Sequence, residues 1–336
     1  MEALQSISII ELDLQDDLIV SWTYPSISED LQQIIAQRSL LKEQNTNFQE
    51  FSFSKFQSTW IYIYSYAFKK ESKSLPEIKA FSIALLAQEF HPEKYKALAK
   101  LLSKTYRRKG NPLHILEQYL SVFSQGKWDN FNISSFDRAK ALSATSINEI
   151  ITLFGEDFML IWCALMMKKN IVVFSHNLDE VLKIIRGLPL FVWHRENFDI
   201  LRPFVQINNI QLQDLQSTLG WVAGFTDPDI RKQNFYDVFV DLTTKTIEVG
   251  ERAQGQIVLT EEQKSLGQTI FAAVESGKKS DQAIIKALTR KNKEFISKIK
   301  SISGENQLTI ETIQKLNLPK PTEIFVLSLA SAEGIL

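Results

Sequence analysis

Hydrophobic and polar residues alternate along the beginning of the chain. Apolar residues recur at every second position over 7–14 and 18–22, and Asp16-Asp17 between them has turn chemistry, which predicts an antiparallel hairpin. The residues SED at 28–30 then open a stretch with helical apolar spacing, which predicts a helix to about residue 41. A strand is predicted over 59–68, where Trp, Tyr and Phe alternate with Ile and Ala.

The flanks of this strand complete a first lobe. Residues 48–56 and 78–86 are its predicted neighbours in a sheet. Pro92 begins a helix whose apolar stripe ends at Gly110. A second helix begins at Pro112 and carries Leu113, Leu116, Leu120 and Phe123. Two strands, a helix, three strands and two helices in this order are typical of a longin-like antiparallel sheet.

A polar stretch between residues 124 and 146 separates this lobe from the rest. Beyond it, strand and helix patterns alternate, which predicts an α/β lobe with a mostly parallel, buried sheet. Its predicted elements are an apolar helix over 147–167, the strand IVVFS, a helix over 178–185, short strands at FVW, FVQI, WVAGF and DVFVDL, and the strand TIEV after the turn TTKT. From residue 260 onward the pattern predicts helices alone.

These patterns predict an α/β (α+β) protein with two lobes. The expected divisions are a longin-like lobe over 1–125, a linker over 126–145, a central α/β lobe over 146–259 and a helical tail over 260–336. The length of 336 residues agrees with two lobes of roughly 150 residues each.

Composition limits the partners and the compartment. With 38 basic and 39 acidic residues the formal net charge is −1, so nucleic acid is not an expected partner. Cys163 is the sole cysteine and lies in an apolar run, which excludes an internal disulfide and favours the reducing cytosol.

The sequence offers little support for covalent or cofactor chemistry. It contains neither GxGxxG nor GxxxxGK[ST], and we interpret Gly220 and Gly224 as sites of close backbone packing. The four histidines lack metal-ligand spacing, and there is no GxSxG motif, so we expect no metal, cofactor or catalytic triad. In the run Trp193–Glu196 we expect Trp193 to anchor a strand end and Arg195 and Glu196 to be solvated.

One helix stands out by its charge. Residues 278–300 carry eight basic and two acidic residues on a predicted amphipathic helix. Lys286, Arg290 and Lys293 are spaced four and three apart and therefore share one face. This face is either an ordinary solvated surface or a binding site for an acidic coiled coil or for anionic lipid headgroups.

The central segment resembles a known family. The segment over 153–208, from LFGEDFMLIW to RPFVQIN, followed by GWVAGFTD and YDVFVDL, resembles the central part of a DENN domain. The upstream pieces LIVSWTYP and FSIALLAQEFHPEKY are similar to its longin-like part. The resemblance covers nearly the whole chain and is loosest after residue 260.

The resemblance implies a role for the chain. Many DENN domains are guanine-nucleotide exchange factors for Rab GTPases, and they need a shaped surface without a cofactor of their own. It implies that the GTPase sits between the lobes, which makes Trp22, Tyr24, Trp193, Arg195, Asp227 and Asp229 candidate contacts. It also implies a peripheral location on late endosomes and a link to the coiled-coil subunits of the Commander endosomal-recycling assembly.

Two functions therefore stay open, with an α/β enzyme as a third. The chain can be a Rab exchange factor that binds the nucleotide-free GTPase. Alternatively, its helical tail is shorter than in many exchange-competent members, which favours a non-catalytic adaptor on a coiled-coil complex. Lys286, Arg290 and Lys293 are the candidate contacts for that second function.

Overall fold

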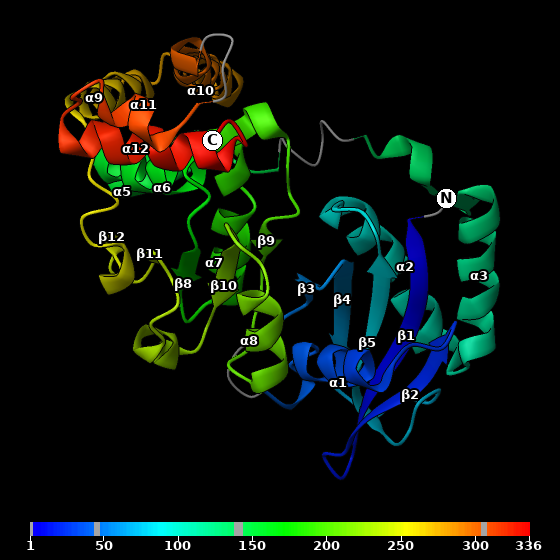
Figure 1. Cartoon of the computed structure of the whole chain (residues 1–336). Coiled ribbons are helices and arrows are strands. Elements are labelled where there is room, and N and C mark those ends of the chain that lie inside the picture. The colour runs from blue at the N-terminus through cyan, green and yellow to red at the C-terminus, as the bar shows by residue number, and fades with distance from the viewer. Residues whose placement is uncertain (1–2, 44–47, 138–143, 304–307) are drawn as a thin grey trace. The chain divides into compact units, whose positions relative to one another are not determined.

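A computed structural model describes residues 3–43, 48–137, 144–303 and 308–336 (Figure 1). The chain forms two compact units, 1–144 and 145–336, and each is described by itself.

The first unit contains a five-stranded antiparallel sheet in the order β2-β1-β5-β4-β3. Its strands are β1 (Leu4–Asp13), β2 (Leu18–Tyr24), β3 (Phe51–Phe56), β4 (Thr59–Ala67) and β5 (Ile78–Ala87). Its helices are α1 (Glu29–Arg38), the short η1 (Leu41–Glu43), α2 (Pro92–Lys109) and α3 (Pro112–Gln125). The predicted order of two strands, a helix, three strands and two helices is confirmed.

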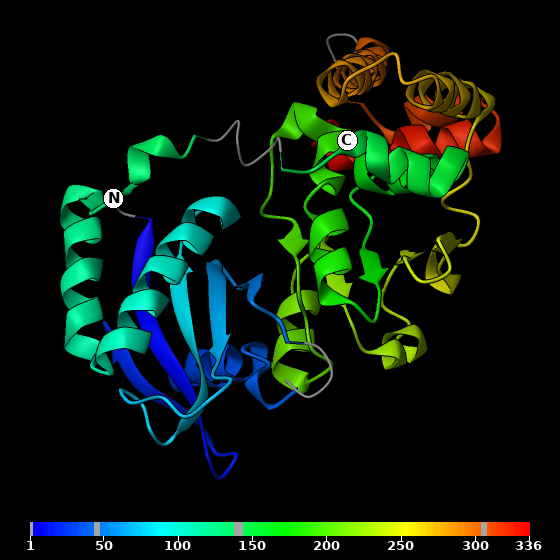
Figure 2. The same ribbon diagram turned by 180° about the vertical axis from the view of Figure 1, so that it is seen from behind.

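Alternation of side chains builds both faces of this sheet. One face, with Ile10, Ile61 and Ala84, forms an apolar core with Ile34 and Ile35 of α1. The opposite face is covered by α2, where the Tyr62 and Tyr95 rings stack 4.5 Å apart and the Phe81 and Tyr106 rings meet edge to face. Figure 2 shows α2 in front of the sheet and α3 beside it.

The helices begin and end where the sequence indicates. The Ser28 hydroxyl caps the N-terminus of α1, and Asn111 caps that of α3. Pro92 lies in the first turn of α2, and Gly110, at φ +63°, ends that helix in the left-handed conformation.

The stretch predicted as a linker contains some ordered structure. A small two-stranded sheet pairs β6 (Lys127–Trp128) with β7 (Phe131–Asn132), and a short turn of helix, η2 (Ile133–Ser135), follows. Residues 138–143 of the predicted linker lie outside the described residues.

The second unit contains a five-stranded sheet in the order β12-β11-β8-β10-β9, in which all pairs except β11–β12 are parallel. Its strands are β8 (Ile171–Phe174), β9 (Leu201–Arg202), β10 (Val222–Phe225), β11 (Val238–Asp241) and β12 (Thr246–Val249). The elements around them are α5 (Ile147–Phe154), η3 (Gly155–Asp157), α6 (Phe158–Met166), α7 (Leu178–Ile185), η4 (Leu188–Arg195), α8 (Asn209–Gln216), η5 (Pro228–Lys232) and η6 (Glu251–Ala253). The mostly parallel, buried sheet is confirmed.

Glycine packing within this sheet is also confirmed. A Cβ at Gly224 would lie 2.1 Å from the carbonyl oxygen of Pro203, so the backbones approach too closely for any side chain. Gly220 adopts φ +67°, and a Cβ there would lie 2.9 Å from the carbonyl oxygen of Lys168.

Three local predictions were wrong. The apolar stretch 147–167 is two helices, because Gly155 adopts φ +58° and ends α5. The FVW run is part of the 3₁₀ segment η4, where Pro189 occupies the first turn. Residues 204–207 (FVQI), which were predicted as a strand, follow β9 and are not part of a strand. Helix α8, which comes after them, was not predicted.

The chain after residue 260 is helical, as predicted. Its helices are α9 (Glu261–Glu275), α10 (Asp281–Ser303), α11 (Ile310–Gln314) and α12 (Lys320–Ala332). A capping box of Thr260 and Gln263 begins α9. Helices α9 and α10 contact α5, and the Trp162 ring of α6 stacks on Phe325 of α12 with 5.9 Å between centroids.

Candidate protein-interaction surfaces

Cys163 lies in the core of the second unit. The Cys163 thiol is buried, and burial raises its pKa to about 12, so the reactive thiolate is suppressed. Across the described part of the chain, no group of three His, Cys, Asp or Glu side chains could hold a metal ion.

In the first unit, the edge strand β2 carries the candidate contacts Trp22 and Tyr24. Their rings stack with centroids 6.4 Å apart, and Tyr24 meets Tyr119 of α3 edge to face at 6.2 Å. Phe123, one helical turn further along α3, stacks on Tyr119 at 6.1 Å. Tyr24 and Phe123 are 39% and 42% exposed, so an aromatic row runs from the edge of the sheet onto α3.

The exposed residues of α3 at the end of this row were not among the contacts predicted from the sequence. Leu113, Leu120 and Phe123, which the helical pattern places on an apolar stripe, are exposed. The buried positions of α3 are Ile115, Gln118, Tyr119 and Val122. The a/d spacing of Leu113, Leu116, Leu120 and Phe123 was the available signal, because this spacing is typical of a helix that receives a partner.

In the second unit, Arg195 is an internal link, and the expectation of a solvated side chain was wrong. Its guanidinium donates to the carbonyl oxygens of Leu165 (2.6 Å) and Met166 (2.7 Å), at the C-terminus of α6. It also forms an ion pair with Glu333, which follows α12. Glu196 is exposed and Trp193 is partly exposed, with its ring 5.9 Å from that of Phe198.

A buried polar network surrounds this ion pair. The Asn292 side chain of α10 is fully buried, accepts a hydrogen bond from Trp162 Nε1 (2.9 Å) and donates to the Phe191 carbonyl oxygen (2.9 Å). Asn292 Nδ2 also lies 3.1 Å from His194 Nδ1. The network joins α6, η4 and α10 to the end of the chain.

The network shifts two pKa values. Burial, with the neighbouring positive charge of Arg195, lowers the pKa of His194 to about 4, so this imidazole is neutral near pH 7. For Glu333, burial opposes ionisation, but the hydrogen bond and the charge of Arg195 outweigh it and lower the pKa of the carboxyl. Both shifts indicate a structural role.

The two candidate acids at the end of β10 differ from each other. The Asp227 carboxylate accepts a hydrogen bond from the Asp229 backbone N–H (2.9 Å) and caps η5. Asp229 is exposed and forms a 2.7 Å ion pair with Lys232, also exposed. Both acids are exposed, but the Asp227 carboxylate also caps η5, whereas the Asp229 carboxylate pairs with an exposed lysine.

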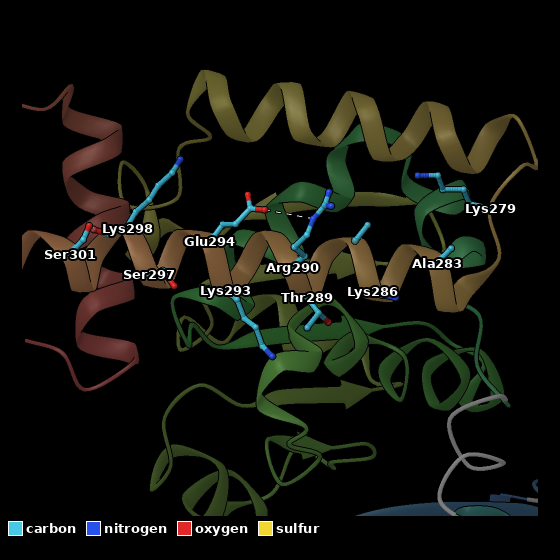
Figure 3. Close-up of a pocket in the computed structure, with 11 residues that line it drawn as sticks. Lys279, Ala283, Lys286, Thr289, Arg290, Lys293, Glu294, Ser297, Lys298 and Ser301 are labelled. Atoms are coloured by element: carbon cyan, nitrogen blue, oxygen red, sulfur yellow. Dashed lines mark hydrogen bonds and ion pairs between the residues drawn. The ribbon is translucent and has the colours of Figure 1, made fainter.

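Helix α10 carries a solvent-open groove of about 1000 Å³ along its outer face. The groove is lined by Lys279, Ala283, Lys286, Ala287, Thr289, Arg290, Lys293, Glu294, Ser297, Lys298 and Ser301. In Figure 3, Arg290 and Lys298 project to one side of the helix and Lys293 to the other.

The charges of this groove are partly paired. Arg290 lies 3.6 Å from Glu294, and Lys298 lies 3.0 Å from Glu262. Within the described residues, no carboxylate lies at ion-pair distance from Lys286 or Lys293, and both side chains are exposed. The opposite face of α10 is anchored in the core by Ile284 and Leu288.

No helix in the described part of the chain is long and apolar enough to cross a bilayer.

Comparisons with known proteins now place the chain in a family. Residues 144–251 match the family model described as SPA, Stabilization of polarity axis. DENN domain-containing protein 10 of Dictyostelium discoideum is 39% identical over 98% of this chain and 97% of its own length. Proteins of the same name from Danio rerio and Homo sapiens are 34% and 32% identical, and the alignments cover 98% and 96% of those relatives. The chain therefore belongs to the DENN domain-containing protein 10 family.

Proposed function

We propose that this chain regulates a Rab-family small GTPase as a guanine-nucleotide exchange factor. An exchange factor accelerates GDP release because it binds the nucleotide-free GTPase more tightly than the loaded form. A thousandfold acceleration corresponds to about 4 kcal/mol of differential binding energy, which contacts at a protein surface can supply. Neither a general base nor a metal of the chain's own is needed.

The observation that carries this proposal is the aromatic row of Trp22, Tyr24 and Phe123. Tyr, Trp and Phe are enriched at the centres of protein interfaces, and exposed clusters of them mark contact sites. Because β2 is an edge strand of the sheet, its outer backbone groups are also open to a partner strand. The resemblance to DENN domains supports a Rab GTPase as this partner.

One candidate contact for the GTPase is less accessible than the sequence predicts. Arg195 is held by its own unit, so the stronger candidates are Trp22, Tyr24, Asp227 and Asp229. Trp193 keeps a partly exposed ring and stays a candidate.

The test is release of a fluorescent GDP analogue from a panel of Rab GTPases. We expect one Rab to respond to the parent protein, and the double substitution Trp22→Ala, Tyr24→Ala to slow release at least tenfold. Phe48→Ala is the matched control, because Phe48 is similarly exposed, at 43%, and precedes β3 at the opposite edge of the same sheet. Absence of a response across the whole panel would refute exchange activity.

A second function is favoured by the groove on α10. An adaptor that docks on the coiled-coil subunits of the Commander complex needs a face complementary to an acidic helix. Lys286 and Lys293, which have no carboxylate at ion-pair distance among the described residues, supply positive charge beside small side chains that allow a helix to approach closely. Arg290, paired with Glu294, adds a third cation. On this proposal the chain is cytoplasmic and reaches late endosomes peripherally, through that complex.

Charge reversal tests the adaptor function. The variant Lys286→Glu, Arg290→Glu, Lys293→Glu should lose the coiled-coil subunits in a pull-down from cytosol, and the parent complex should weaken with salt. The matched control is the Trp22→Ala, Tyr24→Ala variant, which should retain them. Retention of every coiled-coil partner by the reversed variant at low salt would show that this face is only solvated.

A further inference from the structure

Basic side chains gather at one part of the first unit, where two separate segments of the chain meet and together supply the positive charge. Two segments contribute it: the loop after β4 and the last turns of α2. We name the set of seven residues the basic corner: Lys69, Lys70, Lys73, Lys104, Arg107, Arg108 and Lys109. Within 69–73 and 104–109 the only acidic residue is Glu71.

The tertiary structure brings these segments together. The Ser74 hydroxyl donates to the Arg108 carbonyl oxygen (3.0 Å), and a Cβ at Gly110 would lie 2.2 Å from the Ser74 carbonyl oxygen. The Arg107 guanidinium lies over the Tyr66 ring, 4.7 Å from its centroid. The corner is therefore a built surface, since the loop and the helix end hold each other in place.

The cations of the corner are exposed and free of carboxylate partners. All seven side chains belong to exposed residues, and across the described residues none of them has an acidic group at ion-pair distance. At the hairpin tip, Asp16 pairs with Lys79 (2.8 Å) and Asp13 accepts from the backbone of its own turn. Asp17 and Glu77 are exposed acids of the tip and of the loop's end, so the corner has an excess of positive charge but is not purely basic.

The helix dipole accounts for part of this charge. Arg107, Arg108 and Lys109 lie in the last turn of α2, where cations interact favourably with the helix C-terminus. Lys69, Lys70 and Lys73 come from a different segment and have no such role. Their gathering beside the helix end raises the local repulsion, which an anionic partner would relieve.

We propose that the basic corner is a docking surface for an anionic membrane. Five of its seven cations are lysines, whose hydrated point charges suit a diffuse negative surface better than the bidentate recognition that arginine provides. Beside them Tyr66 and Phe68 are partly exposed, with ring centroids 5.1 Å apart, and aromatic rings of this kind favour the headgroup region. The chain as a whole has a net charge of −1, so this local charge would orient the protein at the bilayer.

The test is sedimentation of the full chain with vesicles. Vesicles of phosphatidylcholine alone are compared with vesicles that also contain phosphatidylserine, for the parent and two variants with equal charge change. The corner variant is Lys70→Glu, Lys73→Glu, Arg108→Glu, which spares the Arg107 contact with Tyr66. The matched control is Lys286→Glu, Arg290→Glu, Lys293→Glu on α10.

We expect the parent to bind only the anionic vesicles and to dissociate as salt is raised. The corner variant should bind them roughly tenfold to hundredfold more weakly, because each basic residue near a charged bilayer contributes severalfold to affinity. The α10 variant should bind like the parent, and both variants should show the parent's circular dichroism and melting temperature.

Several outcomes would overturn this proposal. They are parental binding by the corner variant, an equal loss in both variants, a loss confined to the α10 variant, and failure of the parent to bind anionic vesicles. Capture of the parent by polyglutamate or RNA without vesicle binding would reassign the corner to another class of partner. The inference does not rest on exchange activity, because GDP release from a soluble Rab without vesicles should be unchanged in the corner variant.

Discussion

The two faces of α10 use polar residues in opposite ways. On the inner face, Asn292 is fully buried and its amide joins Trp162, Phe191 and His194. On the outer face, Lys286 and Lys293 are exposed and have no carboxylate at ion-pair distance among the described residues. The inner residues hold the second unit together, whereas the outer ones are available to a partner.

The contrast shows that a polar residue on an amphipathic helix is not by itself a mark of function. Asn292 and Lys293 are adjacent in sequence, yet a change at one should affect folding and a change at the other binding. Arg195 belongs with Asn292, because its guanidinium donates to backbone carbonyl oxygens of its own unit and pairs with Glu333. Stability measurements can therefore sort candidate contacts before any partner is known.

The largest effect is expected from the apolar anchor of the inner face. Leu288→Ala should lower the free energy of unfolding by about 2–5 kcal/mol, because Leu288 is fully buried and its truncation leaves a cavity. Urea denaturation of the full chain measures this. A loss below about 1 kcal/mol would mean that α10 is only loosely held by the core.

Asn292→Ala should cost about 2–3 kcal/mol. The substitution leaves Trp162 Nε1 and the Phe191 carbonyl oxygen buried without their partner, and unpaired buried groups are expensive. Its neighbour provides the control, since Lys293→Ala should change stability by less than about 0.5 kcal/mol. Equal effects at the two positions would contradict the division between the faces.

Acid should weaken the inner network through His194. The folded protein holds this pKa at about 4, below the ordinary value of 6.5, so the unfolded chain binds the proton first as the pH falls. Stability should therefore decrease by about 2 kcal/mol from pH 8 to about pH 5 on account of this group. The Glu333 carboxyl contributes at lower pH, because its pKa is lowered in the folded protein. Its stabilisation is lost as the pH falls from the ordinary carboxyl pKa towards this lower value.

The variant His194→Gln isolates this effect. Between neutral pH and pH 5 the denaturation midpoint should fall less in the variant than in the parent, because the variant lacks the titrating group. A parallel decline of both would assign the acid sensitivity to other residues.

Substitutions at Asp227 and Asp229 should differ in their cost to stability, by a smaller amount. Asp227→Ala removes the cap of η5 and should cost about 1 kcal/mol, or about 2–4 °C in the melting temperature. Asp229→Ala breaks only an exposed ion pair with Lys232 and should leave stability within about 0.5 kcal/mol. Thermal denaturation distinguishes them, and a larger loss at Asp229 would reverse the assignment.

The smallest change in stability is expected from the outer face of α10. The variant Lys286→Glu, Arg290→Glu, Lys293→Glu should alter the free energy of unfolding by only a few tenths of a kcal/mol per position. Unfolding at low and high salt checks this, since any electrostatic cost should shrink as salt is added. A loss comparable to that of Leu288→Ala would show that these side chains support the fold.

Much of the fold could be predicted from the sequence, because hydrophobic spacing is a local property. The alternation in 59–68 specified strand β4, and Ser28, Pro92 and Gly110 marked helix ends through their own backbone and side-chain chemistry. The break at Gly155 and the 3₁₀ segment η4 were missed. In both places a single backbone conformation overrides an apolar run that is compatible with longer regular elements.

The candidate sites were less predictable, because exposure depends on residues far away in the chain. The sequence by itself determined the two kinds of sheet, the helical tail, the absence of phosphate-binding and metal motifs, and the charge of α10. Only the tertiary structure decided that Arg195 pairs with Glu333, 138 residues later. Only it decided that the stripe on α3 faces solvent and that the loop of Lys73 and Ser74 meets the end of α2 at Arg108. Spacing along the chain specifies which face of an element a side chain occupies, whereas long-range packing decides what covers that face.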